Sequence, residues 1–170
     1  MQQREFTTAM AKELNVGDKV PDLTVQCVWC GKFTLSEKVK TSPVLLYFYP
    51  ANYGMQCISY SEFMSDYHDD LERIGVTVFH VNPDTLENHE KYMKRLGTRY
   101  DHMADTDGNV CRIFGMLIPS PLPGFRDVPG RGFALIDKEM VLRYIWRAPS
   151  PILLLDIPSL VTELGDILNK

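Results

Sequence analysis

The fold is decided by residues 44–57, which read VLLYFYPANYGMQC. Residues 44–49 form an unbroken apolar run of strand length, which is typical of a strand buried on both faces of a sheet. From Cys57 to Ile74, apolar side chains recur at spacings of three and four, which predicts an amphipathic helix. Residues 51–56 are expected to form the turn between this strand and this helix.

A second strand and a second helix are predicted after the first pair. Residues 76–81, VTVFHV, predict a second buried strand, and residues 86–96 carry their apolar side chains on one side of a helix. The order strand, helix, strand, helix implies that the two strands pair in parallel. Before them, residues 23–28 and 32–35 predict two short strands that form a hairpin around the turn Cys30-Gly31.

The last third of the chain predicts a different order of elements. Residues 119–130 contain four prolines and two glycines, which is typical of a loop. Residues 133–136 and 140–146 predict an antiparallel hairpin, and residues 158–168 predict a final helix. We therefore expect an α/β protein with a thioredoxin-like fold, in which a central mixed β-sheet is flanked by helices and preceded by an N-terminal β-hairpin.

Length and composition predict one globular domain over residues 1–170. The net charge is −4 without a block of Lys and Arg, which argues against nucleic acid as a partner. The most apolar run, residues 152–155, is far shorter than the roughly 20 residues that span a membrane, and residues 1–14 lack the apolar stretch of a signal peptide. We therefore expect a soluble, cytoplasmic protein with no membrane partner.

Cys57 lies at the predicted start of a helix. Free backbone N–H groups and the positive end of the helix dipole favour an anion at this position, so the thiolate is stabilised there. The thiolate is the nucleophilic form of cysteine, which makes Cys57 a candidate for catalysis. The same position also suits a small buried apolar side chain without any chemistry.

Residues 47–57 resemble the peroxiredoxin signature, in which Pro, three residues, Thr or Ser, two residues and then the peroxidatic Cys follow the end of a strand. The spacing from Pro50 to Cys57 matches fully. Residues 131–137, RGFALID, are similar to the R-G-x-F-I-I-D strand of the same family. Two further matches are the motif D-x-D-G-x-V at residues 105–110 and Phe114-Gly115, so the resemblance extends from about residue 16 to residue 146.

The resemblance implies a thiol-dependent peroxidase that needs no cofactor. By this resemblance, Cys57 is the peroxidatic cysteine, whose thiolate attacks a hydroperoxide and becomes a sulfenic acid. Arg131 stabilises the thiolate and the peroxide, and Pro50 shields the thiolate from water. Electrons come from a thioredoxin-like protein or a small thiol, and members commonly form homodimers or larger homo-oligomers. Without the resemblance, Arg131 also suits a surface ion pair and Pro50 a plain strand end.

Gly54 departs from the family pattern. The family has Thr or Ser three residues before the cysteine, where its hydroxyl bonds to the thiolate and the peroxide. Tyr53 and Ser59 are close enough in sequence to supply another O–H. A donor lost from a charged transition state typically costs about 3 kcal/mol, so Gly54 predicts a slower peroxidase. A left-handed turn that needs glycine is a second explanation for this residue.

The resolving cysteine of relatives has no clear counterpart. Glu62 stands five residues after Cys57, and no cysteine follows Cys111. Cys111 falls on a short predicted helix, where it serves either in packing or as a resolving or intersubunit cysteine. Cys27 and Cys30 form a C-x2-C, which is either a redox pair, a resolving partner or ordinary packing.

The C-x2-C also has the spacing of half a zinc site. A second C-x2-C is absent from the sequence, so a zinc site would need a partner subunit, and we predict no metal. The histidines stand on other elements and receive no role; they are His68, His80, His89 and His102.

Two other functions stay open at the level of sequence. One is a thioredoxin-fold disulfide oxidoreductase that uses Cys27 and Cys30 and does not turn over peroxide. The other is a non-catalytic redox sensor in which Cys57 is oxidised only once. The reaction of the reduced protein with peroxide separates these functions from a peroxidase.

Overall fold

The computed structural model describes residues 13–119, 122–124, 127–150 and 152–170. Its strands are β1 (Thr24–Cys27), β2 (Gly31–Thr34), β3 (Val44–Phe48), β4 (Thr77–Asn82), β5 (Asp101–Ala104), β6 (Leu117–Ile118), β7 (Val128–Pro129), β8 (Gly132–Ile136) and β9 (Leu142–Arg147). Its helices are α1 (Leu35–Lys38), α2 (Met55–Asp66), α3 (His68–Arg73), α4 (Leu86–Leu96), α5 (Asn109–Ile113) and α6 (Ile157–Leu168).

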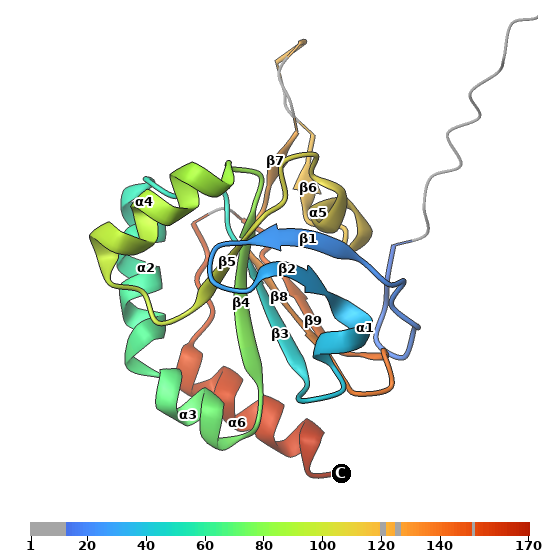
Figure 1. Cartoon of the computed structure of the whole chain (residues 1–170). Coiled ribbons are helices and arrows are strands. Elements are labelled where there is room, and N and C mark those ends of the chain that lie inside the picture. Colours follow the sequence, from blue (N-terminus) through green and yellow to red (C-terminus); the bar gives the residue numbers. More distant parts are fainter. Residues whose placement is uncertain (1–12, 120–121, 125–126, 151) are drawn as a thin grey trace, which may run out of the picture.

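Seven strands form one central sheet in the order β2-β1-β5-β4-β3-β8-β9 (Figure 1). β4 pairs in parallel with both β3 and β5, whereas β8 runs antiparallel to β3 and β9. The N-terminal hairpin of β1 and β2 joins the sheet through antiparallel pairing with β5. The sheet is therefore mixed, and the predicted thioredoxin-like fold with its N-terminal hairpin is confirmed.

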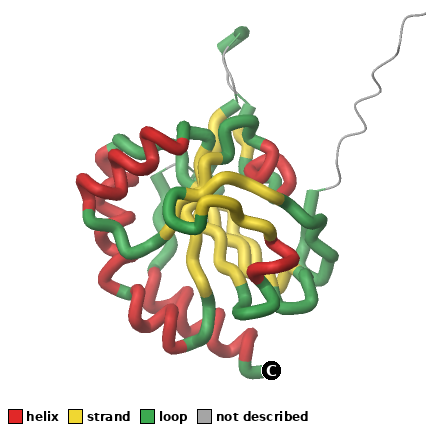
Figure 2. Tube along the Cα trace, in the orientation of Figure 1, coloured by secondary structure: helices red, strands yellow, loops and turns green. Residues whose placement is uncertain are grey.

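β3 lies inside the sheet, and every one of its residues is buried, as the apolar run predicted. Since side chains alternate along a strand, β3 contributes to two cores. The α5-side core takes Val44, Leu46 and Phe48, and it also contains Cys27, Leu35, Val110 and Cys111. The α2-side core takes Leu45 and Tyr47, and it also contains Cys57, Met64, Leu71 and Leu160. Figure 2 shows the helices that pack around the sheet.

Two helices show why their boundaries could be found from sequence. The Thr85 hydroxyl accepts a hydrogen bond from the Asn88 N–H at the start of α4, and Gly97 ends that helix in the left-handed conformation with φ of 63°. The Asp156 carboxylate caps α6 in the same way, and Pro158 stands in its first turn. No helix in the described part of the chain is long and apolar enough to cross a membrane.

Several elements differ from the prediction, among them the short helix α1, which begins at Leu35 where the end of a strand was expected. The helix expected from Cys57 to Ile74 begins earlier, at Met55, and is interrupted at Tyr67, whose φ of −100° and ψ of 12° separate α2 from α3. The apolar spacing continues across this break, so the pattern gave no sign of it. β5 was not predicted, because its sequence DHMA has no apolar run, although all four residues are buried. β7 lies within the stretch that was expected to be a loop, and it pairs with β6, which was not predicted.

Candidate active site

The loop after β3 places Cys57 in the first turn of α2. Gly54 is the N-cap residue, so Cys57 is the third residue of the helix. The first four N–H groups of a helix have no acceptor within it, and they favour an anion beside them. The Cys57 side chain is only 5% exposed and belongs to the α2-side core. The position therefore combines shelter from water with a field that favours the thiolate.

The side chain of Asn52 holds the loop between β3 and α2 in place through hydrogen bonds. Its side chain is 1% exposed and its amide makes four polar contacts. Oδ1 accepts from Tyr49 Oη at 2.5 Å and from Asn82 Nδ2 at 3.1 Å. Nδ2 donates to Asp84 Oδ2 at 3.1 Å and lies 3.4 Å from His89 Nδ1. These contacts fix the backbone between the end of β3 and the start of α2.

Arg131 is the residue directly before β8, and its side chain extends to Cys57. Its side chain is 2% exposed, and its Nη2 lies 3.5 Å from Cys57 Sγ and 3.5 Å from Gln56 Oε1. Nη1 donates to the Tyr47 hydroxyl, and the guanidinium carbon lies 5.4 Å from the centre of the Tyr60 ring. Nε is buried and donates to no described residue. Arg131 is thus fixed with a hydrogen-bond donor directed at the sulfur.

Tyr47 is a site residue that the sequence did not reveal. Burial raises the pKa of Tyr47 well above its ordinary range, so the phenol keeps its proton at neutral pH. Since Arg131 donates to the phenol oxygen, the phenol proton is free to form a second hydrogen bond. Strand alternation was the available signal, because it places Tyr47 on the sheet face that α2 covers.

Gly54 does not need to be glycine for its backbone. Its φ of −68° and ψ of 132° are open to any residue, so the left-handed turn considered from the sequence is absent. A Cβ placed there would lie 3.5 Å from Cys57 Sγ, in ordinary contact. The Ser59 hydroxyl donates instead to the Met55 carbonyl, and the half-exposed Tyr53 packs against Tyr92. A threonine hydroxyl at position 54 would stand beside the sulfur.

Pro50 is partly buried and follows directly after Tyr49. Its predicted role as a shield for the thiolate stays a prediction.

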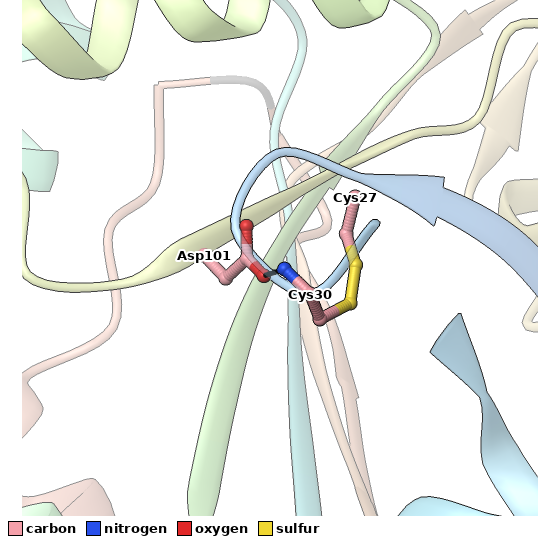
Figure 3. Close-up of side chains that lie close together, drawn as sticks. All are labelled: Cys27, Cys30 and Asp101. Atoms are coloured by element: carbon pink, nitrogen blue, oxygen red, sulfur yellow. Dashed lines mark hydrogen bonds between the residues drawn. A yellow bond between two sulfur atoms is a disulfide. The ribbon is translucent and has the colours of Figure 1, made fainter. Parts of the chain in front are cut away.

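The other cysteines lie away from Cys57. Cys27 and Cys111 belong to the α5-side core, so the sheet separates them from Cys57. Cys111 is fully buried on α5, and burial, followed by the charge of Asp105, raises the pKa of its thiol. Cys27 and Cys30 are joined by a disulfide in the turn between β1 and β2, with 5.6 Å between their Cα atoms (Figure 3).

Three of the histidines, which stand on different elements and were given no role from the sequence, gather in one buried cluster next to Asn52. His102 Nδ1 lies 3.3 Å from His89 Nδ1 and 3.0 Å from Tyr49 Oη. The ring of His80 lies 4.7 Å from that of His102. Burial lowers the pKa of all three, that of His80 to about 3, so the rings are neutral at neutral pH.

The family model and the curated relatives that match this chain indicate the same family. Residues 16–145 match the model of the AhpC/TSA family. The chloroplastic 2-Cys peroxiredoxin BAS1 of Hordeum vulgare is 29% identical over 154 residues, covering 83% of this chain and 71% of the relative. The chloroplastic peroxiredoxin Q of Triticum aestivum is 29% identical over 116 residues, covering 68% of this chain and 52% of the relative.

Solved structures agree on the fold. The reduced 2-Cys peroxiredoxin of Plasmodium vivax has a TM-score of 0.81 at 18% identity, covering 92% of this chain and 83% of that one. The peroxidoxin BcpB of Mycobacterium tuberculosis has a TM-score of 0.77 at 19% identity, covering 92% of this chain and 97% of that one. Three findings indicate the same family: Cys57 is buried at the start of a helix, Arg131 directs a donor at its sulfur, and the chain matches the family model. The chain therefore belongs to the AhpC/TSA family of peroxiredoxins and is a thiol-dependent peroxidase.

Proposed function

We propose that Cys57 is the peroxidatic cysteine and that it reduces hydrogen peroxide or small organic hydroperoxides. The thiolate attacks the terminal oxygen of the peroxide, forming an S–O bond while the O–O bond breaks. Cys57 becomes a sulfenic acid, and the departing oxygen takes up a proton and leaves as water or an alcohol. This step needs a stabilised thiolate and a donor for the negative charge that moves onto the departing oxygen.

The observation that carries this proposal is the contact between Arg131 and Cys57. The guanidinium is always charged and offers several fixed donors, so it favours the thiolate before the reaction and the developing charge during it. Tyr47 and Gln56 hold the guanidinium in place, which lowers the cost of ordering it when the peroxide binds. The Tyr47 O–H is a second donor for a peroxide oxygen.

We further propose a cycle with one cysteine in each chain. The sheet lies between Cys57 and both Cys27 and Cys111, and Glu62 occupies the position of a nearby resolving cysteine. An external thiol therefore condenses with the sulfenic acid, releasing water and forming a mixed disulfide on Cys57. A second thiol then attacks the mixed disulfide and restores the Cys57 thiol. A thioredoxin-like protein or a small thiol suits this task.

Peroxide consumption with dithiothreitol as the reductant tests the proposal. Cys57→Ser should abolish turnover, because a serine hydroxyl is hardly ionised at neutral pH, while Cys111→Ser keeps it. Circular dichroism of both variants establishes that they fold. Turnover retained in a folded Cys57→Ser variant would remove Cys57 from the mechanism.

The same proposal includes a homodimer or larger homo-oligomer in the cytoplasm. Family resemblance supports the assembly of several copies. Sedimentation of the purified chain measures its mass in solution directly, and a monomer at all concentrations would contradict this assembly.

A further inference from the structure

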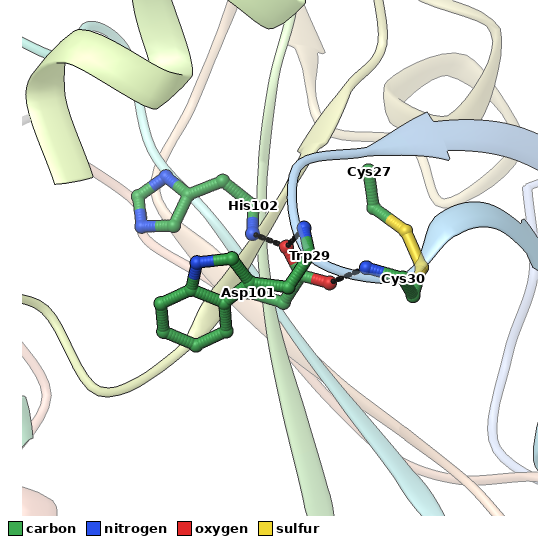
Figure 4. Close-up of a disulfide and its surroundings, with 5 residues drawn as sticks. All are labelled: Cys27, Trp29, Cys30, Asp101 and His102. Carbon is green, nitrogen blue, oxygen red and sulfur yellow. Dashed lines mark hydrogen bonds between the residues drawn. A yellow bond between two sulfur atoms is a disulfide. The ribbon is translucent and has the colours of Figure 1, made fainter. Parts of the chain in front are cut away.

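The disulfide of the C-x2-C joins a buried cysteine to an exposed one. Cys27 is the last residue of β1 and is 1% exposed, whereas Cys30 lies in the open turn and is exposed. Trp29 beside it is 60% exposed, which is unusual for so large an apolar side chain. Figure 4 shows this turn with the disulfide at its edge. A thiolate from outside can therefore reach the bond at Cys30 and not at Cys27.

The turn is held by Asp101 independently of the disulfide. One carboxylate oxygen of Asp101 accepts from the Trp29 N–H at 2.9 Å and from the His102 N–H at 2.8 Å. The other oxygen accepts from the Cys30 N–H at 2.9 Å. Asp101 is itself buried at the start of β5. The backbone of Trp29 and Cys30 is thus held by hydrogen bonds to the Asp101 carboxylate that do not involve sulfur.

The strand pairing adds to this support. Cys27 pairs with Gly31 across the hairpin and with Met103 of β5, and the Val28 N–H donates to the His102 carbonyl at 3.1 Å. A disulfide across three residues constrains the unfolded chain very little, so its stabilising effect is small. Two thiols held in this turn after reduction would stay close enough to close the bond again. The pair is therefore built for opening and closing rather than for stapling the fold.

A hollow next to the turn gives a reductant room to approach. It has a volume of about 370 Å³ and is lined by Trp29, Cys30, Phe79 and Tyr100, together with the oppositely charged side chains of Lys38, Arg99, Glu72 and Asp101.

We propose that Cys27 and Cys30 form a second redox centre, a reversible dithiol–disulfide couple that exchanges with an external dithiol through Cys30 and is independent of Cys57. A thiolate of the dithiol attacks Cys30 Sγ, the bond between the two protein sulfurs breaks, and Cys27 Sγ leaves and takes up a proton. The second thiol of the reductant attacks the mixed disulfide and releases Cys30. Two electrons and two protons pass to the protein, and the reductant becomes a disulfide.

The test uses the full chain carrying Cys57→Ser and Cys111→Ser, so that only the C-x2-C can react. The oxidised protein is treated with dithiothreitol in native buffer, and alkylated thiols are counted by mass spectrometry. We expect two thiols to appear at a rate within about tenfold of that in denaturant, because Cys30 is already an exposed residue in the folded chain. Oxidised dithiothreitol should then restore the disulfide without a change in circular dichroism. Reduction that requires denaturant, or a failure to close again, would overturn the proposal.

Two single-thiol variants locate the point of attack. Adding Cys27→Ser to the same background leaves Cys30 alone, and adding Cys30→Ser leaves Cys27 alone. Alkylation of Cys30 should be faster by on the order of a hundredfold, because Cys30 is an exposed residue whereas Cys27 is 1% exposed. Equal rates in the two folded variants would overturn the assignment of Cys30. The wild-type chain, treated without any peroxide, repeats the reduction test if a variant folds poorly, and its result does not depend on the peroxidase activity.

Discussion

Arg131 Nη2 lies 3.5 Å from Cys57 Sγ, although 74 positions separate the two residues in the sequence. The contact depends on the pairing of β3 with β8, which brings the Arg131 backbone beside the strand that leads to Cys57. The site around the Cys57 sulfur therefore forms only in the folded protein, where the segment after β3 and the segment before β8 meet.

Replacing Arg131 with Met should slow the reaction of Cys57 with peroxide by about a hundredfold or more, because a fixed donor and its charge are lost. Alkylation of Cys57 at neutral pH should slow as well, since the thiolate loses its cation. Stopped-flow kinetics and iodoacetamide labelling measure the two effects. Arg143→Met is the matched control, because Arg143 pairs with Asp137 instead. Unchanged kinetics in a folded Arg131→Met variant would rule out the assigned role.

Tyr47→Phe removes one hydroxyl and leaves Arg131 Nη1 without that acceptor. We expect the oxidation step to slow by roughly tenfold, because the guanidinium is less well held and a donor for the peroxide is lost. Tyr144→Phe changes another buried tyrosine of the α2-side core and should leave the rate unchanged. If both variants react alike, Tyr47 is only a packing residue.

Gly54→Thr should accelerate the reaction with peroxide by about tenfold, because its hydroxyl restores a donor beside the sulfur. The extended backbone and the 3.5 Å spacing to Cys57 Sγ leave room for the side chain. Stability should change by only a few tenths of a kcal/mol, since Gly and Thr are similar N-cap residues. Gly54→Ala supplies the Cβ without the hydroxyl and should give no gain. A stable Gly54→Thr variant with the wild-type rate would mean that another donor already occupies this place.

The histidine cluster predicts how stability depends on pH. The folded-state pKa values of His80, His89 and His102 are lowered by burial, so the unfolded chain binds more protons below about pH 6.5. The free energy of unfolding should therefore fall as the pH drops from about 6.5 toward 3, by about 1.4 kcal/mol per pH unit for each ring that stays neutral.

Urea unfolding between about pH 5 and 6.5 isolates this effect, because most carboxyl groups are ionised there in both states. His80→Phe keeps an aromatic ring in contact with Tyr100 and removes one titrating group, so its slope should be smaller. A slope that is the same in wild type and His80→Phe would contradict a buried neutral His80.

The sequence predicted the part of the fold in which local patterns and burial agree. The apolar run of β3, the helical spacing after Cys57 and the capped ends of α4 each reflect a physical requirement that acts within a few residues. The resemblance of residues 131–137 to the R-G-x-F-I-I-D strand of the family also indicated Arg131. These elements needed no knowledge of distant segments.

The missed features depend on contacts between distant segments. β5 contains Asp101 and His102, which are buried only because the N-terminal hairpin and the histidine cluster supply their partners. From the sequence, Tyr47 was interpreted as a core residue of β3, because nothing in the sequence places Arg131 beside its hydroxyl. Polar groups that are satisfied through tertiary contacts carry no local pattern, so the sequence does not reveal them.

We propose Cys57 as a peroxidatic thiolate that is activated by its position at the start of α2 and by Arg131. Stopped-flow mixing of hydrogen peroxide with the fully reduced chain, carrying Cys27→Ser, Cys30→Ser and Cys111→Ser, tests it most directly. We predict a rate constant at least about a hundredfold above that of a free thiolate, with a sulfenic acid trapped on Cys57. A folded protein that reacts no faster than a free thiolate would contradict the account.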